Sequence, residues 1–150
     1  MTNFDFGNGP VAAHRHPNGG GWVADTATVL ETVYVGLYAW VFGNAQVSGK
    51  AQVFGNARVS GNARVSGKAQ VCDNAQVYGK ARVYGNARVF GNAEVSDNAQ
   101  VYGGAWVSGD SKVGGNAHVY GKARVYDKAM VSGKANVSGN THVYRNDKVS

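Results

Sequence analysis

Arginine and aromatic side chains recur beside regularly spaced valines, and these residue types suit the binding of anions. A guanidinium group presents a planar fork of donors to a phosphate or a carboxylate. Tyrosine and tryptophan rings offer flat faces on which bases or sugars stack. The pattern therefore favours a site for an anionic small molecule, with nucleotides among the candidates, although such rows can also simply solvate and stiffen a β surface. The candidate ligand-binding residues are Arg64, Arg82, Arg88, Arg124, Tyr84, Tyr102, Tyr120 and Trp106.

The histidines and the single cysteine offer little for catalysis. His118 is a candidate general base, but that role needs a partner and an enclosed site, and the surrounding sequence indicates neither. We expect no metal site, because His14, His16, His118 and His142 lack the spacing of a zinc-ligand set. His14 and His16 could share a metal, although a place in a terminal cap is the favoured interpretation. Cys72 is expected to be an unreactive surface thiol.

Length and charge point to one domain with anionic partners. The chain has 150 residues and a formal net charge of +6. Such a surplus attracts nucleotides, phosphorylated sugars, acidic surfaces or nucleic acid, and we favour small molecules over nucleic acid. The apolar runs are too short to span a membrane, and the first residues do not resemble a secretory signal. A single cysteine agrees with a reducing compartment, so we expect a cytoplasmic protein.

A six-residue repeat governs almost the whole chain. Valine recurs at every sixth position from Val23 to Val149, 22 times without a skipped step. A small residue, most often alanine, stands two positions before each valine, so both side chains point to one face of an extended segment. In a helix, successive valines would be rotated by about 240°, which leaves no single apolar face. Each hexad is therefore predicted to be a short strand followed by a sharp corner.

Identical hexads joined by identical corners coil in one direction and stack their valines in parallel register. Three hexads per coil would close a triangular prism of about seven coils. The corners carry glycine from Gly43 onward. Glycine adopts a positive φ readily, and aspartate tolerates it better than most other residues do. Residues 1–21 break the repeat and are expected to cap one end, while residues 22–150 form the prism. Four corners depart from glycine, at Asp73, Asp97, Asp127 and Arg145.

This repeat resembles that of the hexapeptide-repeat proteins, whose unit places an aliphatic residue four positions before a small one. Segments 41–46 (VFGNAQ) and 83–88 (VYGNAR) fit at both positions and depart at the residue after valine. The resemblance covers about residues 22–150 and implies an all-β fold, a left-handed parallel β-helix. It also implies a homotrimer with ligand clefts between adjacent prisms.

The same family includes acyltransferases that use a catalytic histidine and coenzyme A, often beneath loops that project from the coils. No loop interrupts residues 23–149, so an enzyme is not the favoured interpretation. Coenzyme A is expected as a cofactor only under this alternative, with His118 as its candidate catalytic residue.

Residues 18 apart share a face of the prism if three hexads form a coil. One face then carries Tyr84, Tyr102 and Tyr120 beside Arg64, Arg82 and His118, and a second carries Arg88, Trp106 and Arg124 beside Phe54, Phe90, Tyr126 and Tyr144. We expect a non-catalytic homotrimer that captures an anionic small molecule in clefts between subunits. A structural scaffold, such as a filament or a phage-associated fibre, is a further alternative.

Overall fold

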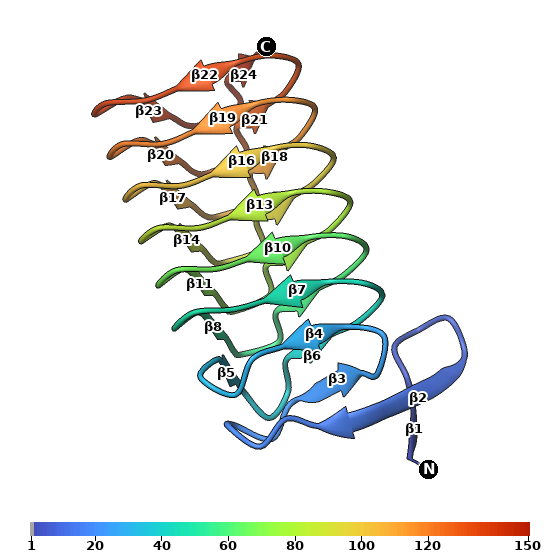
Figure 1. The fold of residues 1–150 in the computed structure, drawn as a ribbon. Helices are drawn as coiled ribbons and strands as arrows, with labels where there is room; N and C mark the ends of the chain where they lie inside the picture. Colours follow the sequence, from blue (N-terminus) through green and yellow to red (C-terminus); the bar gives the residue numbers. More distant parts are fainter. Residues whose placement is uncertain (1) are drawn as a thin grey trace.

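The chain winds into a three-sided parallel β-solenoid (Figure 1). The computed structural model describes residues 2–150, and no helix occurs in this part of the chain, so none is present that could cross a membrane. Each coil contributes one strand to each of three sheets in turn, so a strand pairs with the strand three places later. Val65, for example, pairs with Val47 below and Val83 above. The predictions of an all-β fold and of three hexads per coil are confirmed.

Sheet 1 has ten strands and holds both ends of the described chain. Its members, in spatial order, are β1 (Asn3–Asp5), β2 (Pro10–Arg15), β3 (Trp22–Ala24), β6 (Trp40–Val41), β9 (Arg58–Val59), β12 (Gln76–Val77), β15 (Glu94–Val95), β18 (Lys112–Val113), β21 (Met130–Val131) and β24 (Lys148–Val149).

Sheets 2 and 3 have seven strands each, which gives the expected number of about seven coils. Sheet 2 contains β4 (Thr28–Val29), β7 (Gln46–Val47), β10 (Arg64–Val65), β13 (Arg82–Val83), β16 (Gln100–Val101), β19 (His118–Val119) and β22 (Asn136–Val137). Sheet 3 contains β5 (Tyr34–Val35), β8 (Gln52–Val53), β11 (Gln70–Val71), β14 (Arg88–Val89), β17 (Trp106–Val107), β20 (Arg124–Val125) and β23 (His142–Val143).

The coils turn in the left-handed sense that the resemblance implied. In Figure 1 the strands of sheet 2 cross the front toward the left while the chain climbs from its N-terminus to its C-terminus. The strands of the repeat are short because each hexad must also supply a corner, and the three sheets are therefore narrow.

Valine and alanine fill the interior of the prism. Every repeat valine from Val35 to Val125 is at most 1% exposed. Ser111 stands at an alanine position, and its buried hydroxyl donates a hydrogen bond to the Ser108 carbonyl at 2.7 Å. Adjacent coils are joined through the backbone, as where the Arg64 N–H donates to the Ala81 carbonyl at 2.9 Å. Because core and backbone repeat in this way, outward side chains 18 residues apart stack in columns at the spacing of the coils.

The corners adopt the left-handed conformation that their residues predict. From Gly43 to Arg145 the residue two positions after each valine has a φ between 57° and 68°. The aspartates add a bond that glycine cannot make: the Asp73 carboxylate accepts the N–H of Gly91 in the next coil at 3.0 Å. Asp97 and Asp127 make the equivalent bonds to the residues 18 positions later. These corners therefore join adjacent coils through a side chain as well as the backbone.

The first two strands form an antiparallel hairpin that extends sheet 1 beyond the first coil, since β2 pairs with β3. The hairpin also reaches the outer face of that sheet. The Phe4 ring stacks on Trp22 with centroids 4.6 Å apart, and the Phe6 ring stacks on Phe42 at 4.9 Å. Sheet 1 is therefore the side of the prism that the N-terminal segment occupies.

The loop after the hairpin lies against the edge of sheet 3. The Val35 N–H donates to the Asn18 carbonyl, and the Gly21 N–H donates to the Val35 carbonyl, both at 3.0 Å. Hairpin and loop together pair backbone groups at the edges of two sheets.

Candidate ligand-binding site

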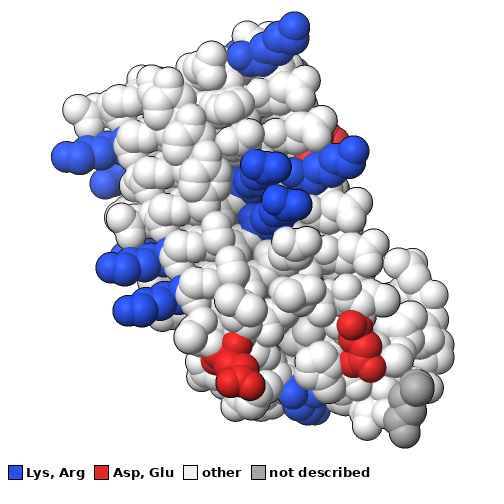
Figure 2. Space-filling view, viewed as in Figure 1, with Lys and Arg blue, Asp and Glu red and all other residues white. Residues whose placement is uncertain are grey.

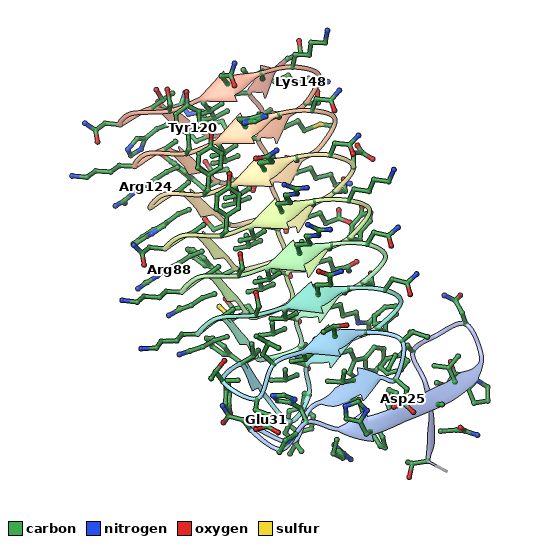
Figure 3. All side chains as sticks on the ribbon, viewed as in Figure 1. Asp25, Glu31, Arg88, Tyr120, Arg124 and Lys148 are labelled. Atoms are coloured by element: carbon green, nitrogen blue, oxygen red, sulfur yellow. The ribbon has the colours of Figure 1, made fainter. Side chains whose placement is uncertain are left out.

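The residues that the sequence singled out lie on two different faces of the prism. Sheet 2 carries Arg64, Arg82, Tyr84, Tyr102 and Tyr120, at the ends of β10, β13, β16 and β19. Sheet 3 carries Arg88, Trp106 and Arg124, which are in register with one another. Figure 3 labels Arg88 and Arg124 on the side of the prism that this sheet forms. Within one chain, the eight candidates therefore form two groups rather than one site.

Sheet 2 contains a hollow of about 290 Å³, which we call the basic hollow. Three successive coils line it, and each gives one residue beside a corner and one from the following strand. The lining residues are Asn44, Gln46, Asn62, Arg64, Lys80 and Arg82. The sequence pattern pointed to Arg64 and Arg82 but not to Lys80, although Lys80 stands 18 positions after Asn62 and so continues its column.

The basic hollow is positively charged and has no acidic lining residue. The outward strand positions of sheet 2 carry no carboxylate from Thr28 to Ser138. Figure 2 shows Lys and Arg side chains gathered near the middle of the face that this sheet presents. Within residues 2–150 the ion pairs join His14 to Asp25 and Lys112 to Glu94, and none involves the cations of the hollow. Arg64, Lys80 and Arg82 therefore attract anions without a competing carboxylate.

A tyrosine ladder, formed by Tyr84, Tyr102 and Tyr120, runs beside the arginine column. Successive rings are parallel within 3°, with centroids 4.8 and 5.0 Å apart. The Tyr84 hydroxyl donates to Gln100 Oε1 at 3.1 Å, which ties the ring to the next coil. Burial raises the pKa of Tyr102, and its two tyrosine neighbours raise it further. The middle ring is covered on both sides, so free ring faces exist only at the two ends of the ladder.

His118 belongs to the edge of this ladder rather than to a catalytic arrangement. Its Nδ1 lies 3.4 Å from the Tyr102 hydroxyl, and its ring meets that tyrosine edge to face. The partner is thus a phenol and not a carboxylate, and His118 does not line the basic hollow. His118 lies on sheet 2 and His142 on sheet 3.

The two N-terminal histidines have separate partners. His14 Nδ1–H donates to Asp25 Oδ1 at 2.7 Å, whereas His16 is buried and its Nε2–H donates to the Val33 carbonyl at 2.8 Å. Across residues 2–150, no group of three or more His, Cys, Asp and Glu side chains is placed to hold a metal ion.

On sheet 3, Trp106 lies between two arginines. The guanidinium carbons of Arg88 and Arg124 lie 5.4 and 4.3 Å from its ring, one from the coil below and one from the coil above. These cation–π contacts occupy both ring faces, so a ligand would have to displace an arginine to stack on Trp106. The neighbouring depression includes Asp127, which makes it less suited to anions than the basic hollow.

Cys72 is partly buried on sheet 3. Burial raises the pKa of its thiol to about 11, the Asp73 carboxylate adds to the rise, and Arg88 opposes it. The thiol is therefore protonated at neutral pH, in agreement with the expected unreactive cysteine.

Comparison with known proteins supports the β-solenoid architecture and gives no information about a ligand or an activity. A family model, the YdcK beta-solenoid repeat, matches residues 51–67 and 81–95. No curated protein gives a significant match to the chain. Together with the three-sided parallel solenoid, the match fits a β-helix that is like those of hexapeptide-repeat proteins.

Proposed function

We propose that this chain is a non-catalytic β-solenoid binding protein that captures an anionic small molecule in the basic hollow of sheet 2. The observation that carries the proposal is the convergence of Arg64, Lys80 and Arg82 on a hollow without acidic lining. The two arginines are paired across adjacent coils, about 4.8 Å apart along the axis. At that spacing both guanidinium groups can donate to oxygens of one phosphate or carboxylate.

The rest of the lining suits a polar ligand. Asn44, Gln46 and Asn62 carry amides that both donate and accept hydrogen bonds. They offer partners to hydroxyl or carbonyl groups attached to the anion. An extended polar molecule with one charged end therefore fits this lining better than an isolated inorganic ion.

We further propose that the protein is a homotrimer with its ligand clefts along sheets 2 and 3. The N-terminal hairpin occupies part of the outer face of sheet 1, through Phe4 and Phe6. The hairpin does not extend over the outer faces of sheets 2 and 3. A neighbouring subunit beside sheet 2 would wall the open side of the hollow and strengthen its electrostatics by excluding water.

Calorimetric titration with pyrophosphate at low salt tests the anion site. We expect the double variant Arg64→Gln/Arg82→Gln to bind at least about tenfold more weakly, because charge-assisted hydrogen bonds are lost. Glutamine already stands in the same column at Gln46 and Gln100, so the fold should tolerate the change. Arg88→Gln/Arg124→Gln removes equal charge from sheet 3, outside the lining of the hollow, and should weaken binding much less. A wild-type protein without binding heat, or a loss only in the control, contradicts the proposal.

Sedimentation and turnover assays separate the alternatives. A discrete species of about three times the 15.7 kDa chain mass supports the trimer, whereas open-ended polymers favour a scaffold. Acetyl-coenzyme A turnover that is lost in His118→Ala would instead favour an acyltransferase.

A further inference from the structure

The tyrosine ladder stops above two serines. The outward position after each valine of sheet 2 is occupied, in successive coils, by Leu30, Ser48, Ser66, Tyr84, Tyr102, Tyr120 and Ser138. The two coils directly below Tyr84 therefore carry serines in place of rings, and we call this gap the serine notch, defined by Ser48 and Ser66. The lower face of Tyr84 has no aromatic neighbour in its own column, and the gap spans about 10 Å, or two coil spacings.

The serine notch lies in the two lower coils of the basic hollow, and Tyr84 lies in the third. Arg64 and Ser66 are successive outward residues of one rung, about 7 Å apart, and Arg82 and Tyr84 have the same relation one coil above. A free ring face and a cluster of cations are thus neighbours at this end of the ladder. At the other end the free face of Tyr120 lies below Ser138, and the strand residue of that coil is the uncharged Asn136.

We propose that the ligand of the basic hollow is a nucleoside phosphate whose base extends the tyrosine stack into the serine notch. Its phosphate binds Arg64, Lys80 and Arg82, so the inference rests on the proposed anion-binding function. The rings of the ladder are held parallel within 3°, which keeps the lower face of Tyr84 presented to the notch. The Ser66 hydroxyl can both donate and accept a hydrogen bond at the edge of the base. Stacking of this kind is tolerant of base identity.

Titration with adenosine 5′-monophosphate and with ribose 5-phosphate separates the two parts of the site. Both carry the same phosphate, and only the first carries a base. We expect the nucleotide to bind about tenfold more tightly, because one stacked base typically contributes a factor of this size. Tyr84→Ser should abolish the difference by weakening the nucleotide alone. Tyr120→Ser makes the same change at the end of the ladder where sheet 2 carries no arginine, and it should leave both affinities unchanged.

The reverse substitution gives an independent test that does not depend on removing a ring. The double substitution Ser48→Tyr/Ser66→Tyr would extend the ladder by two rungs and fill the notch, so it should weaken the nucleotide about tenfold while ribose 5-phosphate still binds. Ser138→Tyr adds a ring at the other end as its control. Equal binding of the two ligands, unaffected by Tyr84→Ser, overturns the nucleotide inference and leaves the anion site standing. Absence of binding by both ligands overturns both proposals.

Discussion

The corner at Gly67 offers a direct test of how adjacent coils constrain one another. Gly67 has a φ of +65°, and a Cβ there would lie 3.0 Å from both the nitrogen and the oxygen of Gly85 in the next coil. Gly139, in the last coil, has a φ of +62°, but a Cβ there would meet nothing within 4 Å. Gly67→Ala therefore combines two unfavourable effects, whereas Gly139→Ala has only the conformational one.

Typical energies for the two effects give their expected size. The left-handed conformation costs an alanine about 1–2 kcal/mol, and a less flexible unfolded chain offsets about 0.4–1 kcal/mol of this. The close backbone contact at Gly67 adds roughly 1 kcal/mol. We therefore expect Gly139→Ala to lower the free energy of unfolding by about 1 kcal/mol and Gly67→Ala by about 2 kcal/mol. In a chain of this length the difference corresponds to about 2–4 °C in Tm.

Gly67→Asp should be less harmful than Gly67→Ala although its side chain is larger. Asp73 accepts the N–H of the residue 18 positions later at 3.0 Å, and an aspartate at position 67 would do the same for Gly85. The Gly85 N–H has no acceptor in the part of the chain that the structure describes. A hydrogen bond to a carboxylate at this exposed corner should return about 1 kcal/mol.

Urea unfolding followed by far-ultraviolet circular dichroism measures all three variants on one scale. Gly67→Ala is expected to be the least stable of the three, with Gly67→Asp and Gly139→Ala each about 1 kcal/mol below the unmodified protein. If Gly139→Ala loses as much as Gly67→Ala, the contact between coils contributes nothing. If Gly67→Asp is no better than Gly67→Ala, the hydrogen bond of the aspartate corners does not stabilise the solenoid.

Three further changes test the core, the thiol and the hairpin. Val83→Asp places a carboxylate in the dry interior, so it should lower the free energy of unfolding by several kcal/mol and split the stack of coils. Val149→Asp, at the partly buried last rung, should lower it much less. Thermal melts compare the two variants. The pKa of the Cys72 thiol is raised to about 11, so at pH 8 it should react with iodoacetamide roughly a hundredfold more slowly than an ordinary cysteine. Its reaction rate should keep rising as the pH approaches 11. A rate that levels off near pH 9 contradicts the raised pKa. Phe6→Ala removes a buried ring that stacks on Phe42, at a cost of about 3 kcal/mol, so limited proteolysis should cut the hairpin while the circular dichroism of the solenoid persists.

The fold could be predicted from the sequence because every hexad repeats one set of local choices. The uninterrupted valines from Val23 to Val149 give the strand positions, the inward face and the coil length together. The repeat also predicts the backbone conformation of corners that lack glycine. Asp73, Asp97 and Asp127 adopt the positive φ that their place in the repeat indicates. The N-terminal segment has no such period, and nothing in its sequence says that Phe4 and Phe6 pack on the outer face of sheet 1.

The site was predictable only where it follows the 18-residue columns. Those columns place Arg64 with Arg82 and align the three tyrosines, and they put Trp106 between Arg88 and Arg124. Lys80 and the two asparagines escaped notice because they stand beside corners, where the depth of a hollow depends on side-chain conformations. The column of Trp106 places an arginine on each side of it. Only the geometry of the side chains establishes that these arginines cover both faces of the ring.

On sheet 2 a tyrosine ring face is free only where its column changes. Within an unbroken ladder each ring covers the next, as Tyr102 is covered by Tyr84 and Tyr120, and no face remains for a ligand. On sheet 2 the change from serine to tyrosine falls between positions 66 and 84, in the same coils where the neighbouring strand column is arginine. A free ring face and unpaired cations then coincide at one height of the prism. Because each column changes independently of the others, this coincidence locates a site that the composition of either column alone would not reveal.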